Sequence, residues 1–465
     1  MPGLSAECWE VQSMQVSEYL EAVTTQMRCK RARGMVEKEL KAHIEDQADK
    51  YMEFGIPKEE AVIKAVEQMG DPIQVGADMD RLHRPDIDKW SLFLICLLSL
   101  GGGILYRWSI DMGDGRMFQI GDYFEHLLLD VLPGMLLMWL IIKIDYTRIA
   151  RHPFLLSLAL VMISGFFDYF GTGGKYGYVF LSFTLNAVLF GAILHKLRKY
   201  KLKGMLLGFL WLMSITLLYH FSGRANMTNS VNLLAIGMVL LGVAAFKDWF
   251  EVGRKKSTAI FVGLLCTMVL FCGARLFFYG FSGASYIKYR LLGWIGNNRD
   301  ENYIFNMIRG EAEHASFFTG SGNLTGVGNE NEYFIINLIS RYGYLAAILV
   351  SVLLGLLFLV LFSGIKKQQN RLGTLMGVAA ILTLCIPVVE HIAYNLSLIP
   401  TGSLILPFFS GTGSDAWLQG DYCRGAILGY YVAMGFCLSV YRSRNIVTEQ
   451  DAEPGLRFKL KLERQ

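Results

Sequence analysis

Ionisable side chains inside apolar segments are the residues of this chain best placed for unusual chemistry. Six of them fall within long hydrophobic runs: Asp130, Asp168, Arg275, Arg341, Glu390 and His391. An ionised group is costly in lipid, so we expect each to face the protein interior or a water-filled cavity. Glu390 and His391 follow Pro387, where a helix kink frees backbone carbonyls. Two interpretations of this pair stay open: a cavity that binds a lipid substrate, and pairing between neighbouring helices.

Two long polar connections between hydrophobic runs are further candidates. The first, residues 282–332, ends at Glu332 and is rich in glycine, asparagine and charged residues. A connection this long between packed helices is usually functional or disordered, and its aromatic side chains, such as Trp294 and Phe317, favour order. The second, residues 399–417, is expected to be ordered and to dip back toward the membrane.

The eight cysteines form no recognisable site. None belongs to a CxxC pair or to a Cys/His pattern with metal-ligand spacing, so we interpret them as small packing residues. The sequence therefore predicts no metal site, and no nucleic acid is expected as a partner.

The elements that carry these residues are predicted to be membrane helices. Of 465 residues, 53% are hydrophobic and only 18% are charged, below the roughly 25% of soluble domains. Spanning a bilayer takes about 20 apolar residues. Suitable runs lie near 90–108, 125–145, 153–171, 176–194, 204–223, 231–250, 257–281, 333–362, 374–400 and 425–443. The predicted fold class is all-α, a polytopic membrane protein with about ten transmembrane helices.

Residues 1–87 differ from the rest, because they hold 11 Lys and Arg and 17 Asp and Glu. Val36, Leu40 and Ile44 recur at helical spacing among charged residues, which predicts an amphipathic helix. Residues 57–69 predict a second helix with its own start and stop signals. We expect a small cytoplasmic helical bundle that resembles the permease-prefix type of domain and acts in regulation or protein contact.

Lysine and arginine are unevenly distributed among the short connections between the predicted spans. Four connections on one side hold fifteen: Lys143, Arg148, Arg151, Lys196, Arg198, Lys199, Lys201, Lys203, Lys247, Arg254, Lys255, Lys256, Lys366, Lys367 and Arg371. Those on the other side hold four: Arg116, Lys175, Arg224 and Arg424. The positive-inside rule predicts that both termini are cytoplasmic and that 282–332 is outside. The basic tail, 446–465, is expected to lie on anionic membrane lipids.

Four segments of residues 88–445 carry motifs. The most specific contains nine motif residues: Pro400, Thr401, Gly402, Leu406, Pro407, Phe408, Ser410, Gly413 and Ser414. The others are Asp145-Tyr146 after the second span, Arg290 upstream of Tyr303, and Glu332 with the residues up to Gly343. With these four segments, residues 88–445 resemble the SEDS family (shape, elongation, division, sporulation), the FtsW/RodA/SpoVE-type proteins with ten spans.

The resemblance implies a multi-pass protein of the bacterial cytoplasmic membrane that polymerises lipid II, or another polyprenyl-diphosphate-linked sugar, with a class B penicillin-binding protein. The family's catalytic Asp aligns with Glu332, which would deprotonate the acceptor hydroxyl. Cationic residues would stabilise the departing diphosphate; the candidates are Lys288, Arg290, Arg299 and Arg309. Further candidate substrate-binding residues are Tyr303, Glu390 and His391. No cofactor is implied, other than a divalent cation that could accompany the diphosphate.

The sequence also departs from the family pattern. Glu332 stands in place of Asp, the Gln-Pro-Ser-Glu that opens the fourth span is missing, and Leu406-Pro407-Phe408 comes one residue late. The alternative function is therefore non-catalytic: a transporter (flippase) of a lipid-linked precursor, or a scaffold for a penicillin-binding protein. Either function fits a role in cell division, cell shape or sporulation.

Overall fold

The computed structural model describes most of the chain. The described residues are 15–113, 120–170, 176–221, 227–281, 294, 303–322, 330–400, 402, 405–411 and 420–445. All regular structure within them is helical, and the chain divides into two compact units, one of residues Met1–Asp86 with Ser443–Gln465 and one of Ile87–Arg442. The predicted fold class, an all-α polytopic membrane protein with an N-terminal helical bundle, is confirmed.

The smaller unit packs four helices around one apolar core. They are α1 (Val16–Gln26), α2 (Lys30–Glu53), α3 (Lys58–Gln68) and α4 (Pro72–His83). The predicted apolar stripe of α2, Val36, Leu40 and Ile44, lies in this core with each side chain at most 3% exposed. Helices this short persist in water because they bury such stripes against one another.

The described residues that follow the last membrane helix also belong to the smaller unit. The side-chain amide of Asn445 donates a hydrogen bond to the carbonyl of Leu82 at 2.6 Å, and its own carbonyl lies 3.1 Å from Nδ1 of His83. Arg444 forms an ion pair with Asp86 at 3.7 Å. Both ends of the described chain therefore contribute to this unit.

Ten helical segments among the described residues of the larger unit fall at the ten predicted spans. Eight stretches of the described residues have the length and hydropathy of membrane spans, and one of them, Phe180–Tyr219, comprises two helices. The shorter apolar helix α9 completes the set. In chain order the spans are α5 (Lys89–Gly113), α6 (Ile120–His126) with the π-helix η1 (Leu127–Val131) and α7 (Leu132–Lys143), α9 (Pro153–Phe170), α10 (Tyr176–Leu197), α11 (Lys201–Phe221), α12 (Met227–Phe246), α13 (Arg254–Phe281), α17 (Tyr344–Lys366), α18 (Arg371–Asn395) and α19 (Gly420–Arg442).

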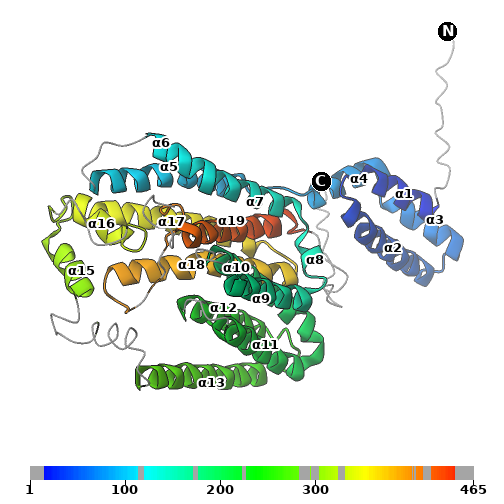
Figure 1. Ribbon diagram of the computed structural model, residues 1–465. Helices are drawn as coiled ribbons and strands as arrows, with labels where there is room; N and C mark the ends of the chain where they lie inside the picture. The colour runs from blue at the N-terminus through cyan, green and yellow to red at the C-terminus, as the bar shows by residue number, and fades with distance from the viewer. Residues whose placement is uncertain are drawn as a thin grey trace, which may run out of the picture. The chain divides into compact units, whose positions relative to one another are not determined.

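The spans differ in how deeply they are buried within this unit. α19 contacts α7, α10, α17 and α18, and 89% of its most apolar stretch is buried. α13 lies at the edge of the unit, and only 11% of its most apolar stretch is buried (Figure 1). The short helices α15 (Tyr303–His314) and α16 (Phe334–Tyr342) lie at one end of the unit, and α8 (Tyr146–Ile149) lies at the other (Figure 1). The two helices on either side of Glu332 in the chain, α15 and α16, are thus at the same end.

One predicted span is wrong at its start. The sequence predicted a continuous helix over 333–362, but the structure breaks it at Gly343 into α16 and α17. Gly343 has a φ of +84°, and a Cβ there would lie 2.8 Å from the carbonyl oxygen of Ser316. The same carbonyl accepts a hydrogen bond from the amide of Tyr344, the first residue of α17. The chain turns here because only glycine fits this conformation and this space.

Candidate functional site

Glu332, the predicted base, lies just before α16 and is held by two phenols. Its Oε1 accepts hydrogen bonds from the hydroxyl of Tyr333 at 3.2 Å and from that of Tyr394 at 3.1 Å. The two hydroxyl oxygens are themselves 3.1 Å apart, and both tyrosines are buried. Glu332 itself is partly exposed. One oxygen of this carboxylate is therefore oriented by buried donors.

The main chain at Glu332 is fixed by Asn395, the last residue of α18. The amide nitrogen of Asn395 donates to the carbonyl of Glu332 at 3.1 Å and to that of His391 at 2.8 Å. Its amide oxygen accepts from the backbone N–H of Ile336 at 3.0 Å, and the side chain is fully buried. The C-terminal end of α18, with Tyr394 and Asn395 side by side in sequence, thus positions both the carboxylate and the backbone of Glu332.

A buried ion pair fixes the chain two residues earlier. Glu330 and Arg341 approach to 2.5 Å, and the Arg341 side chain is 1% exposed. Arg341 also donates to the carbonyl and, at 2.6 Å, to the hydroxyl of Ser109 in α5. The second carboxylate oxygen of Glu330 accepts from Asn337 at 3.2 Å. Arg341 therefore faces the protein interior, as expected for an ionisable residue in an apolar run. Its bonds also connect α5, the first span, to the chain at Glu330.

The motif segment 405–411 lies directly against these residues. The side-chain amide of Asn331 donates to the carbonyl of Gly411 at 3.0 Å and accepts from the Gly411 N–H at 3.1 Å. Within the segment, the hydroxyl of Ser410 closes a turn by bonding both the N–H and the carbonyl of Leu406, at 2.9 and 2.8 Å. Two segments that the sequence singled out separately, the one at Glu332 and the one at Leu406, therefore meet in space.

Gly402 packs against the surface of α18 that carries Glu390 and Tyr394. A Cβ on Gly402 would be 2.5 Å from Cβ of Tyr394 and 2.7 Å from the carbonyl of Glu390, which leaves no room for a side chain. Oε2 of Glu390 accepts a hydrogen bond from Asn232 of α12 at 2.9 Å, and His391 is fully buried. This contact is the interhelical pairing that was one of the two interpretations, and a substrate role for the pair stays a prediction.

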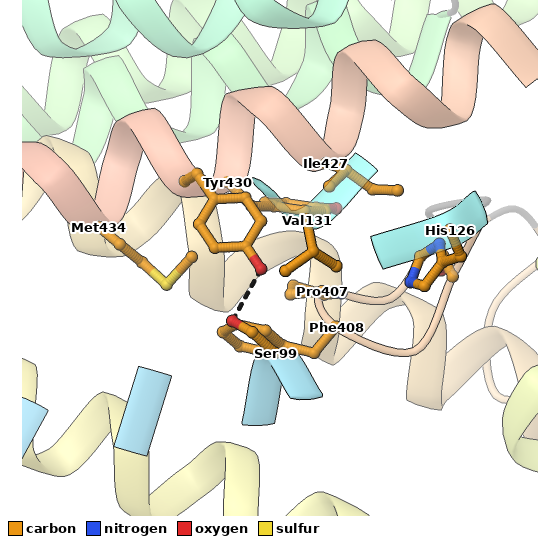
Figure 2. Close-up of a pocket in the computed structure, with 10 residues that line it drawn as sticks. Ser99, His126, Val131, Pro407, Phe408, Ile427, Tyr430 and Met434 are labelled. Carbon is orange, nitrogen blue, oxygen red and sulfur yellow. Dashed lines mark hydrogen bonds between the residues drawn. The ribbon is translucent and has the colours of Figure 1, made fainter. Parts of the chain in front are cut away.

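A small cavity of about 10 Å³, enough for roughly one water molecule, lies behind the motif segment. Figure 2 shows that its walls come from four places in the chain: Ser99 of α5, Val131 of η1, Pro407 of the motif segment and Ile427 of α19. His126 and Phe408 also line it (Figure 2).

Asp130, beside this cavity, is fully buried and has two partners. One oxygen lies 2.9 Å from Nδ1 of His126, and the other accepts from Nε of Arg424 at 3.2 Å. A buried carboxylate needs such partners, since an isolated charge in a protein interior is strongly unfavourable. Asp130 thus faces the interior as predicted, on the π-helical turn η1.

Several predicted site residues lie outside the described residues or only partly within them. Thr401, Gly413, Ser414, Lys288, Arg290 and Arg299 are outside, as are the side chains of Asp168 and Arg275. Tyr303 is described as the first residue of α15, without its side chain. Arg309, on the same helix, donates to the carbonyl of Trp294 at 3.5 Å. The predicted cationic contacts to a diphosphate therefore stay predictions.

A comparison with models of protein families found a match within the membrane unit. Residues 302–419, which hold Glu332, Asn395 and the motif segment, match the model of the cell cycle protein family FtsW/RodA/SpoVE. The predicted resemblance to the SEDS family is confirmed over these residues. A search of curated proteins found no match.

Solved structures are similar to this chain. One, titled as the structural coordination of polymerization and crosslinking by a peptidoglycan synthase complex, has a TM-score of 0.56 at 16% identity. That alignment covers 77% of this chain and 98% of the other. The crystal structure of the Thermus thermophilus rod shape determining protein RodA has a TM-score of 0.47 at 14% identity, over 77% of this chain and 97% of the other. At such identities the likeness concerns the fold alone.

Sequence reasoning missed most of the residues that hold Glu332. Tyr394 and Asn395 end an apolar run, and their polar character there was the one available signal, since Tyr394 follows Glu390 at helical spacing. Asn331 and Gly411 gave none, because they are 80 residues apart in the chain. The role of Glu330 was also missed: it belongs to the buried ion pair with Arg341.

Proposed function

We propose that this SEDS-family protein takes part in peptidoglycan synthesis as a glycosyltransferase that polymerises lipid II on the outer side of the cytoplasmic membrane. The observation that carries the proposal is the carboxylate of Glu332, oriented by Tyr333 and Tyr394 beside the SEDS motif segment. A positioned carboxylate is what the reaction needs, because the acceptor hydroxyl must lose a proton as it attacks.

In the proposed reaction Glu332 takes the proton of the acceptor hydroxyl, and the resulting oxygen nucleophile attacks the anomeric carbon of the donor sugar. A new glycosidic bond forms while the bond from that carbon to the diphosphate oxygen breaks. The lipid diphosphate leaves with the bonding electrons, and cationic side chains stabilise its charge. Lys288 and Arg290 are the proposed partners of this leaving group, and a divalent cation is a further proposed participant.

The proposed partner is a class B penicillin-binding protein, which would cross-link the strands that this protein makes. The fold likeness to a protein described in a peptidoglycan synthase complex of polymerization and crosslinking supports this pairing. The proposed topology has both termini in the cytoplasm, because the basic connections lie on that side. The process served is cell division, cell shape or sporulation.

The test is polymerisation of purified lipid II by the full-length protein, alone and with candidate penicillin-binding proteins. Glu332→Gln keeps size and polarity but removes the proton acceptor, so we expect a loss of about 10²–10⁴-fold in rate. Glu332→Asp restores the residue type of the family and should retain activity. Glu313→Gln is the matched control, because Glu313 is an exposed carboxylate on α15 in the same outer region.

Two outcomes would contradict the proposal in different ways. Polymerisation by Glu332→Gln at the native rate would show that Glu332 is not the base. If the native protein never polymerises lipid II, and Glu332→Gln still complements a strain that lacks the gene, the function is that of the scaffold or transporter and not that of the enzyme.

A further inference from the structure

We propose that the two hydrogen bonds between the Asn331 side chain and the Gly411 backbone, called the joint below, position the base. Asn331 is then a positioning residue for Glu332. This inference rests on the function proposed above, but the joint itself has a readout that does not require activity. Asn331 precedes Glu332 directly in the chain, so whatever holds its side chain also limits where Glu332 can be.

The contact is a two-point one between a side chain and a single backbone residue. The amide of Asn331 gives one hydrogen bond to the Gly411 carbonyl at 3.0 Å and takes one from the Gly411 N–H at 3.1 Å. Two antiparallel bonds to one residue fix orientation as well as distance, as in a strand ladder. The side chain is 8% exposed, and its amide nitrogen also lies 3.4 Å from Sγ of Cys423 on α19.

Gly411 is in turn fixed from the opposite side. Its carbonyl accepts a second hydrogen bond from the buried hydroxyl of Tyr106 in α5 at 3.3 Å. A Cβ on Gly411 would lie 2.7 Å from the ring of Tyr106 and 2.9 Å from Nδ1 of His126. The motif segment therefore has no space in which to slide, and it forms a fixed support between two spans and Asn331.

The identity of the side chain follows from this geometry. Aspartate would keep the acceptor for the Gly411 N–H, but it would place a carboxylate oxygen against the Gly411 carbonyl, where a donor is needed. Alanine would lose both bonds. Because a displacement of about 1 Å from the productive geometry can cost about 10²-fold in rate, loosening this joint should lower kcat more than it raises KM.

A purely structural role for Asn331 is the competing explanation, and a second buried asparagine separates the two. Asn186 of α10 is 2% exposed and bonds Ser157 and Tyr219, both at 2.5 Å, far along the chain from the site. In the full-length protein Asn186→Ala should lower the Tm while leaving kcat near the native value. Asn331→Ala should lower kcat by about 10²-fold with little change in KM, and Asn331→Asp should fall between Asn331→Ala and the native protein.

The activity-independent readout is the alkylation rate of a cysteine at position 332. Glu332→Cys is labelled with maleimide in the full-length protein, and mass spectrometry of the peptide separates this thiol from the native cysteines. Adding Asn331→Ala should raise the rate about tenfold, the factor expected from losing two ordinary hydrogen bonds. Adding Asn186→Ala should not. Asn331→Asp serves in the same assay if Asn331→Ala does not fold.

The two assays separate failure of the joint from failure of the proposed function. If the native protein does not polymerise lipid II but Asn331→Ala still accelerates labelling at position 332, the joint stands and the enzyme does not. If the native protein polymerises, yet Asn331→Ala changes neither kcat nor the labelling rate, the joint is overturned. If Asn331→Ala lowers kcat no more than Asn186→Ala does, the joint is overturned as well.

Discussion

Three consecutive residues, Glu330, Asn331 and Glu332, each reach a different part of the membrane unit. Glu330 bonds Arg341, Asn331 bonds Gly411, and Glu332 bonds the two phenols. Each of the three side chains therefore has a protein partner, and the partners lie in different parts of the unit: Arg341 in α16, Gly411 in the motif segment and Tyr394 in α18. If Glu332 is the base, as proposed, its fixed neighbours leave little to reorganise when a substrate binds, which is how a preorganised site lowers a barrier.

The ion pair of Glu330 and Arg341 yields a stability prediction at this scale. Arg341→Ala would leave a poorly exposed carboxylate without its cation, and breaking a buried pair in this way typically costs about 3–5 kcal/mol. Arg341→Lys keeps the charge but lacks the planar fork that bonds Ser109 and Glu330 together, so it should be intermediate. The measurement is the Tm of the full-length protein in detergent.

A matched pair on the surface provides the control for that experiment. Lys64→Ala removes a pair with Glu60 in which both side chains are about half exposed, at 44% and 56%, and exposed pairs contribute little. The Tm should hardly move. A native-like Tm for Arg341→Ala would mean that the ion pair does not hold the segment in place.

The residue types of the site were predictable only where they had a local signature. Glu332 could be chosen from the sequence because it stands at the edge of an apolar run in a family-like context. Arg341 could be assigned to the interior from the cost of a charge in lipid. Its partner could not, since nothing in the spacing of Glu330 distinguishes a paired acid from a solvated one.

At the scale of elements, hydropathy located every span but not the breaks inside them. Residues 333–362 stay apolar through Gly343, so the mean hydropathy of consecutive residues does not separate α16 from α17. The π-helical turn η1 is hidden for the same reason, although it places Asp130 in the interior. A break in a helix depends on the backbone conformation and on the tertiary contacts at that point. The hydropathy of the sequence reports neither.

Gly343→Ala tests the break between α16 and α17. Alanine at a φ of +84° is strained, and its Cβ would also meet the backbone of Ser316 and Thr319 at 2.8 Å. We expect a loss of about 1–3 kcal/mol of stability, or more if the contact cannot relax. Because Glu332 lies just ahead of α16, polymerisation should fall as well.

Gly355 of α17 is the matched control, since it is a helical glycine with no atom within 4 Å of a built Cβ. Gly355→Ala should leave the Tm unchanged or raise it slightly, because alanine has the better helix propensity. Equal Tm values for the two variants would show that the turn at Gly343 does not need glycine.

At the scale of the whole molecule, the smaller unit is joined to the membrane unit through both α5 and α19. The sequence predicted one boundary near residue 87 and treated the tail as a separate basic segment. The structure adds residues 443–445 to the smaller unit, through Asn445 on Leu82 and His83 and Arg444 on Asp86. Composition could not show this, because those contacts are made by a few polar residues that are distant in sequence.

Tyr19 of the smaller unit gives a prediction about pH. Burial, and then the negative charge of Asp71, raise the pKa of Tyr19 from 10.0 to about 12 in the folded state. Between these values the unfolded chain loses the phenolic proton first. The contribution of Tyr19 to stability is therefore complete below about pH 10 and is lost as the pH rises toward 12. With allowance for solvent screening, we expect a loss of about 1–2 kcal/mol.

The measurement is urea unfolding of the excised residues 1–87 by circular dichroism at pH 9 and pH 11.5. The predicted bundle should unfold cooperatively at pH 9, as expected of helices that share a core. Tyr19→Phe keeps the ring but removes the titrating hydroxyl, which donates to the Met69 carbonyl at 3.3 Å. It should be slightly less stable at pH 9 and lose less stability than the native sequence at pH 11.5. Lysines titrate in this range in both proteins, so only the difference between the two curves reports on Tyr19. An identical pH dependence would show that ionisation of this buried phenol does not limit the stability of the bundle.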